Sequence, residues 1–195
     1  MSDEGKSILA GLKQIRGFFE QTSLLLRTID DQMRREGWKS YGNTVTSNVS
    51  QSIQNPKAWL PDYLFRFFFS EKNENLLLSV SILIDDDVYG EYITKMVEPF
   101  VTFGYFDYGR GKKAPDSLNY ALAAWYGYYG DLSVAGTIHS RENWREDEKE
   151  KYEFESYGSA GLPLVEIRNS VDVSNKIVHP LLDLVSNNLK HNPPG

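Results

Sequence analysis

Apolar residues recur at spacings of four and three near the N-terminus, and this row constrains the fold more than any other feature of the chain. Its members are Ile8, Leu12, Ile15, Phe19, Leu26, Ile29 and Met33. Only Thr22 interrupts the row. Such spacing is typical of an α-helix with one buried face. Gly37 then offers a left-handed C-terminal cap. The pattern therefore predicts one long amphipathic helix over residues 6–36.

Two different surfaces could cover the apolar face of this helix. One is the protein's own sheet. The other is a second helix, because a period near 3.5 residues also fits a coiled-coil or four-helix seam. Gly11, Gly17 and Thr22 weaken a continuous seam. Both alternatives stay open, so we expect either burial within the fold or self-association and docking on a protein partner.

The clearest β pattern covers residues 63–84. An aromatic run, Tyr63 to Phe69, and an aliphatic run, Leu76 to Ile84, flank a polar stretch that suits a hairpin loop. Further strands are predicted over residues 99–108, 132–139, 152–157 and 164–167, with a glycine turn within 158–163. Further helices are predicted over residues 89–97, 115–129 and 174–189. Pro180 implies that the last helix is kinked or begins near His179.

These elements define an α+β fold. We expect a long N-terminal helix, a mostly antiparallel sheet of five to six strands, and a C-terminal helix packed on one face. GAF and PAS sensor domains have a comparable order of elements, an analogy with no motif behind it. The 195 residues fit a single domain over 1–195. Residues 1–5 and 191–195 are expected to be frayed tails.

Composition excludes several classes of function. The chain has no cysteine, which excludes disulfides, thiolate zinc sites and cysteine nucleophiles. A net charge of −6 argues against non-specific nucleic-acid binding, which needs a basic face. The polar, acidic start is unlike an export signal, and the most apolar run is too short to span a bilayer. We therefore expect a cytoplasmic protein without a membrane span.

An acidic triplet, Asp85-Asp86-Asp87, follows the second predicted strand. Carboxylates at a strand end are suitable ligands for Mg²⁺, so Asp85 and Asp87 are candidate metal ligands. Glu166 and Arg168 form Glu-Ile-Arg, loosely like the Glu-x-Lys end of some metal-dependent nucleases. There carboxylates carry the metal and a cation stabilises the developing charge. These four residues are the catalytic candidates, although aspartate also ends strands for structural reasons.

A basic glycine loop, Gly109-Arg110-Gly111-Lys112-Lys113, precedes the helix predicted over 115–129. Exposed amides, cations and a helix dipole favour an anion such as a phosphate group. The loop matches neither the Walker pattern nor the dinucleotide fingerprint. Aromatic residues crowd the segment 100–129 and suit either a recognition surface or a core. The predicted ligand-binding residues are Tyr108, Arg110, Lys112, Lys113, Trp125 and Tyr126.

Histidine suggests no catalytic arrangement. The three histidines lack metal-ligand spacing, and His139 and Ser140 are neighbours on a predicted strand and so point to opposite faces. The sequence therefore favours a non-catalytic binding or regulatory protein that recognises a small phosphate-bearing ligand or a protein partner. The alternatives are a metal-dependent phosphodiesterase or nuclease, and a structural subunit assembled through the N-terminal helix.

Overall fold

The computed structural model describes residues 2–46, 49–54, 59–84, 98–114, 137–140 and 153–191. Its elements are α1 (Asp3–Arg35), β1 (Lys39–Ser40), β2 (Tyr63–Phe69), β3 (Leu76–Leu83), β4 (Phe100–Asp107), β5 (Thr137–Ser140), β6 (Ser156–Pro163), a 3₁₀ turn (Leu164–Glu166), α4 (Ser170–Val173), a π turn (Ser174–Val178) and α5 (His179–His191). This order confirms the α+β fold. The helices predicted over 89–97 and 115–129 lie outside the described residues.

The strands form one antiparallel sheet in the order β1-β2-β3-β4-β6-β5. The predicted hairpin is confirmed, with Tyr63 opposite Leu83 and Phe68 opposite Leu78. Neighbouring strands along the chain pair as a meander from β1 to β4. The sheet then continues with β6, and β5 forms the edge beyond it.

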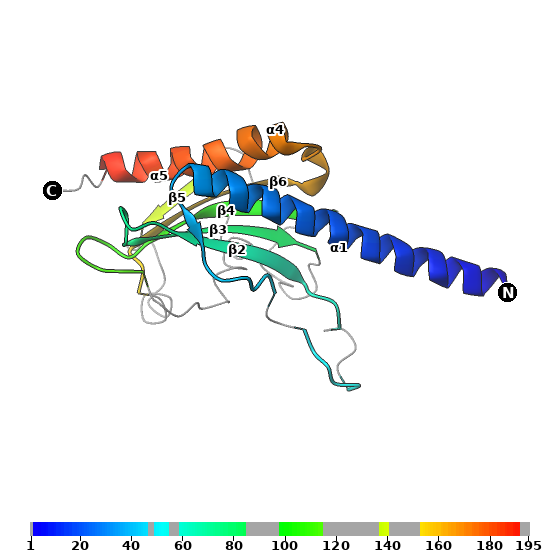
Figure 1. Ribbon diagram of the computed structural model, residues 1–195. Coiled ribbons are helices and arrows are strands. Elements are labelled where there is room, and N and C mark those ends of the chain that lie inside the picture. The colour runs from blue at the N-terminus through cyan, green and yellow to red at the C-terminus, as the bar shows by residue number, and fades with distance from the viewer. Residues whose placement is uncertain are drawn as a thin grey trace.

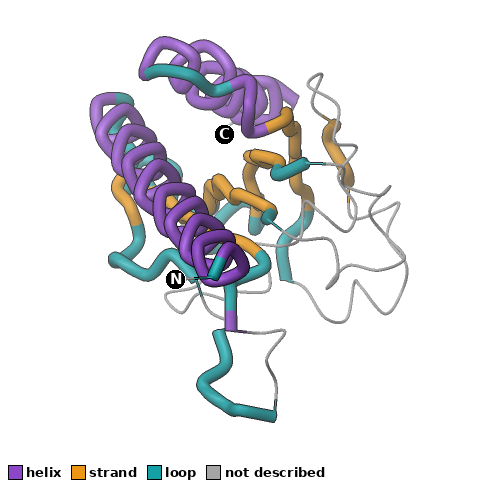
Figure 2. The backbone as a smooth tube through the Cα atoms, turned by 90° about the vertical axis from the view of Figure 1, so that its right-hand side faces the viewer, coloured by secondary structure: helices purple, strands orange, loops and turns teal. Residues whose placement is uncertain are grey.

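Both helical segments lie on the same face of this sheet (Figures 1 and 2). The run from α4 to α5 lies beside α1, and the core fills the space between these helices and the strands. That core includes Leu26, Ile29, Met33, Trp38, Leu64, Phe68, Leu78, Val80, Ile82, Val101, Phe103, Ala160, Leu162, Val173, Ile177, Leu181 and Val185. The expected packing of a C-terminal helix on one face is thus confirmed. Among helices in the described part of the chain, none has both the length and the apolar character that crossing a bilayer requires.

Helix α1 begins with Ser2, whose side chain accepts a hydrogen bond from the Gly5 amide. It ends at a glycine cap, as predicted, because Gly37 has a φ of 84°. The Gly37 amide donates to the Arg34 carbonyl (3.1 Å) and the Trp38 amide to the Met33 carbonyl (3.0 Å). These two bonds form a Schellman motif, whose usual apolar contact is provided by the buried Trp38 and Met33. The cap therefore fixes where the chain turns from the helix into β1.

The predicted glycine turn at 158–163 is wrong, because Gly158 and Gly161 lie inside the continuous strand β6. A Cβ on Gly158 would lie 2.5 Å from Tyr105 Cε1, and one on Gly161 would lie 2.7 Å from Phe100 Cε1. Glycine inside a strand often marks a position where another group approaches the backbone closely. These glycines make room for aromatic rings of β4. The strand predicted over 164–167 is also wrong, since the chain forms a 3₁₀ turn there.

The C-terminal helical run begins at Ser170, four residues earlier than predicted. The Asn169 side chain caps it by accepting hydrogen bonds from the Val171 and Asp172 amides. Pro180 lacks the amide that would bond to the carbonyl of Lys176. The π turn immediately before α5 accommodates this missing donor, so the helical run continues through the proline.

Candidate functional site: an apolar groove beside the free half of α1

Helix α1 has two halves with different environments. In the C-terminal half, Leu26, Ile29 and Met33 are buried against the sheet. The N-terminal half continues past the sheet edge to the N-terminus (Figure 1). There Ile8, Leu12 and Ile15 are 66%, 57% and 41% exposed. With 3.6 residues per turn, they lie on the same face as the buried residues. The face that the sheet covers in one half is therefore left open in the other.

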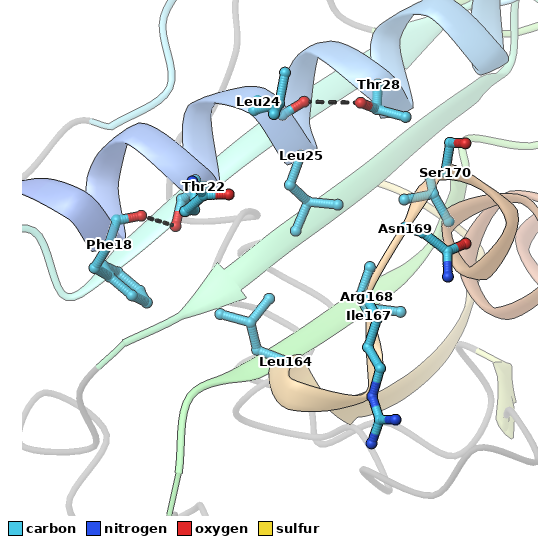
Figure 3. A pocket seen from close by; sticks show the side chains of 12 residues that line it. Phe18, Thr22, Leu24, Leu25, Thr28, Leu164, Ile167, Arg168, Asn169 and Ser170 are labelled. Carbon is cyan, nitrogen blue, oxygen red and sulfur yellow. Dashed lines mark hydrogen bonds between the residues drawn. The ribbon is translucent and has the colours of Figure 1, made fainter.

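A groove begins where this open face meets the body of the protein. It has a volume of about 240 Å³. One wall is α1, with Phe18, Gln21, Thr22, Leu24, Leu25 and Thr28, and the other is the segment after β6, with Leu164, Ile167, Arg168, Asn169, Ser170 and Val173. Leu25 and Leu164 point toward one another across it (Figure 3). The groove thus extends the apolar row of α1 onto a second segment of the chain.

The polar groups of this groove are largely engaged within the fold. The hydroxyls of Thr22 and Thr28 donate to carbonyls one turn earlier, at 2.8 and 2.9 Å (Figure 3). Asn169 caps α4, and the Ser170 carbonyl accepts from Gln32 Nε2 at 2.9 Å. Hydroxyls bonded to their own helix in this way offer no free donor. The groove therefore suits apolar side chains better than a reacting substrate.

The predicted metal and catalytic residues do not come together among the described residues. Asp85 and Asp87 lie outside them. Glu166 lies on the 3₁₀ turn rather than on a strand, and its carboxylate is 3.8 Å from Lys176 Nζ. Strand β4 separates β3 from β6, so Glu166 does not follow a neighbour of β3. Arg168 lines the groove, with its guanidinium directed away from α1 (Figure 3). Within the described ranges, no three histidine or carboxylate side chains gather as a metal site.

The basic glycine loop forms a tight turn, and one of its amides and one of its lysines donate hydrogen bonds to carboxylates. Gly109 and Gly111 have positive φ, as the glycines of such a turn require. The Gly109 amide donates to Asp107 Oδ1 at 2.9 Å, and Lys112 Nζ donates to Glu155 Oε1 at 2.9 Å. A Cβ on Gly109 would collide with that Glu155 carboxylate. Arg110, Lys112 and Lys113 are exposed, but the turn holds an acidic side chain where an anion would be expected.

Among the predicted ligand-binding aromatics, Tyr108 is buried and its ring packs edge-on against Phe154, with centroids 6.1 Å apart. Burial raises the pKa of Tyr108 to about 12, and the charge of Glu153 adds to the shift. Its ring belongs to the packed interior beside β4 and is not displayed at the surface. Trp125 and Tyr126 lie outside the described residues.

Sequence reasoning missed the groove because its walls are far apart in the chain. Gln32 and Ser170, which join the two walls by a hydrogen bond, are separated by 138 positions. The available signals were Phe18, Leu24 and Leu25, which are apolar residues outside the row and line the groove. No family model matches the sequence, and comparisons with curated proteins and with solved structures likewise found no match.

Proposed function

We propose that this is a non-catalytic binding protein that assembles through α1, with a second copy of the chain as the partner. The observation that carries the proposal is the row of α1 that is buried at Leu26 and Ile29 but open at Ile8 and Leu12. Exposed apolar residues that form one continuous face mark an interaction surface. We call Ile8, Leu12, Ile15 and Phe19 the free face.

An antiparallel pairing of two free faces fits the position of the sheet. From Thr22 onward the same side of α1 is covered by the protein's own fold, so a parallel partner helix would collide with the sheet. In the antiparallel arrangement each sheet lies beyond the free end of the other helix. Ile8 of one copy then faces Phe19 of the other, and Leu12 faces Ile15. This alternation is the knobs-into-holes pattern of a helical seam.

The residues that flank the free face are compatible with close approach. Gly11 borders it, and a Cβ at this position would have no atom within 4 Å. In the antiparallel pairing Gly11 faces Phe18 of the other copy, so a small residue meets a large one. Lys6, Lys13 and Glu20 lie on the side of the helix away from the free face. The seam therefore buries none of these charges, and burying unpaired charges would be costly.

The pairing also gives the groove an occupant. With Ile8 opposite Phe19, the first turn of one α1 reaches the region of Thr22 and Leu24 of the other. The overlap then spans about 30 Å of helix. The groove at Leu25 and Leu164 lies at the end of this overlap. Its apolar lining would extend the area that the two copies bury together.

The oligomeric state of the full chain tests the proposal. Sedimentation equilibrium should show a dimer that dissociates on dilution. Leu12→Glu places a charge in the seam and should give a monomer with unchanged helix content. Gln14→Glu is the matched control, because it adds the same charge to an exposed outward position and should leave the dimer intact. A wild-type monomer at every concentration, or a dimer that survives Leu12→Glu, would contradict the proposal.

Disulfide trapping tests the relative orientation of the two α1 helices. The chain has no cysteine, so only the introduced thiols can form a disulfide. A mixture of Ile8→Cys and Phe19→Cys proteins should form a mixed disulfide. Each variant alone should not cross-link, because its two thiols would lie roughly 16 Å apart along the seam. Efficient cross-linking of Ile8→Cys with itself would instead indicate parallel pairing.

A further inference from the structure

The connection between β1 and β2 carries large apolar side chains that lie at the surface. Val49, Ile53, Trp59 and Leu60 are 44%, 84%, 52% and 51% exposed. We call residues 49–54 and 59–60 the apolar loop. None of these residues is charged. An exposed apolar patch without charge is typical of the centre of a protein interface, with tryptophan as a frequent anchor.

Hydrogen bonds support the apolar loop at its base and within it. The Phe65 amide donates to the Val45 carbonyl at 2.9 Å, which ties the start of the connection to β2. Trp59 Nε1 donates to the Ser52 carbonyl at 2.9 Å. The polar group of the indole is thus satisfied inside the loop. A partner can therefore bury the ring without leaving a donor unpaired.

The apolar loop lies on the same side of α1 as the sheet and projects below the middle of the helix (Figures 1 and 2). The free face points to this side as well, because Ile8 and Leu12 share a face with Leu26, which is buried against the sheet. In the antiparallel pairing the partner's helix lies along the free face. It therefore lies between the helix and the apolar loop of the first copy.

We infer that the apolar loop is a second contact of the dimer and packs on the side of the partner's α1 that the seam leaves open. This inference rests on the proposed assembly through α1. The antiparallel register sets Ala10 of one copy at the level of Gly17 of the other, near the middle of the helix. Ala10 lies about 200° around the helix from Ile8, so it faces away from the seam, and its small side chain leaves room for Ile53 and Trp59. Each copy then holds the helix of the other between its own helix and its own loop.

Sedimentation equilibrium of full-length variants tests the second contact. Ile53→Ser and Trp59→Ser should each weaken the dimer at least about tenfold, because both remove a large apolar side chain from the interface. Gln51→Ser is the matched control, since it changes an exposed polar residue of the same loop and should leave the affinity unchanged. In a chain that already carries Leu12→Glu, Ile53→Ser should leave the melting temperature unchanged, because Ile53 is 84% exposed in the single chain.

Tryptophan emission gives a second measurement that does not depend on weakened binding. Trp59 is 52% exposed in the single chain and becomes buried in the dimer, so the emission should shift to shorter wavelength as the protein concentration rises. Trp59→Phe should remove most of this shift at concentrations where the variant is still dimeric.

The outcomes separate the apolar loop from the seam. The inference is overturned, and assembly through α1 stands, if Leu12→Glu dissociates the dimer while Ile53→Ser and Trp59→Ser leave it unchanged. It is also overturned if the emission of the wild-type protein stays constant through the transition from monomer to dimer. A wild-type protein that remains monomeric at every concentration would overturn both proposals.

Discussion

Arg66 of β2 forms a two-point ion pair with Asp30 of α1, and this pair joins the helix to the second strand of the sheet. Arg66 Nε lies 2.9 Å from Asp30 Oδ1, and Nη2 lies 2.7 Å from Oδ2. The side chains are only 4% and 19% exposed. Bidentate geometry of this kind fixes both direction and distance. The pair therefore sets the rotation of α1 about its axis, and with it the direction in which the free face points.

Breaking this pair should cost considerable stability. Asp30→Ala leaves a buried guanidinium without its counter-ion, and such losses amount to about 3 kcal/mol or more. The exposed pair between Asp31 and Arg34 provides the control, because surface pairs contribute below about 1 kcal/mol. Urea unfolding of Asp30→Ala and Asp31→Ala should separate the two cases. Equal losses would show that Arg66 is not dependent on Asp30.

Two glycine-to-alanine substitutions should change the stability of the protein in opposite directions. Gly158→Ala forces a methyl group against the Tyr105 ring, and overpacking typically costs about 1–3 kcal/mol. Gly17→Ala meets no atom within 4 Å on α1 and should stabilise the helix by up to about 1 kcal/mol. Thermal unfolding measures both. A neutral Gly158→Ala would mean that β4 and β6 have more room than the contact with Tyr105 allows.

Stability should fall at alkaline pH because of Tyr108. Its usual pKa of 10 rises to about 12 on burial, so the unfolded chain releases this proton first. The folded state then binds more protons between these values, and the free energy of unfolding decreases as the pH rises. The expected slope is about 1 kcal/mol per pH unit above pH 10. Burial raises the pKa of Tyr105 as well, which acts in the same direction. Tyr108→Phe should reduce the slope and leave the part that comes from Tyr105, as urea unfolding across this range will show.

The Asn169 cap should contribute measurably to the stability of the protein. Asn169 accepts hydrogen bonds from the Val171 and Asp172 amides at 2.8 and 3.0 Å. Replacing such a residue by alanine typically costs about 1 kcal/mol. Asn169→Ala should therefore lower the melting temperature, whereas Asn169→Ser should largely preserve it because a serine hydroxyl also accepts a capping hydrogen bond. Because Asn169 also lines the groove, the dimer should be assayed alongside.

The elements that the sequence predicted are those whose cause is local. The spacing of apolar residues from Ile8 to Met33 and the cap at Gly37 were sufficient to predict α1. The two apolar runs on either side of residues 71–75 were sufficient to predict the β2–β3 hairpin. Of the two alternatives for the apolar row, packing on the sheet is confirmed for its second half. Its first half is exposed, and the pairing of that half with a partner stays a prediction.

The errors arose where the cause lies elsewhere in the chain. Gly158 and Gly161 suggested a turn, yet their role is set by the rings of Tyr105 and Phe100 on the neighbouring strand. Local patterns cannot show which ring lies opposite a glycine. The groove likewise depends on distant contacts, because its two walls come from α1 and from the segment after β6.

Arg66 has a second consequence, which concerns the chain before it folds. The strand Tyr63–Phe69 contains one charge among six aromatic or aliphatic residues. Segments of this kind aggregate when they are transiently exposed, and a single charge within them acts as a gatekeeper. Asp30→Ala removes the ion pair but keeps the charge of Arg66 in the strand. Arg66→Met removes the ion pair and the charge together. We therefore expect the side chain that orients α1 in the folded protein also to reduce aggregation of β2 before the chain folds.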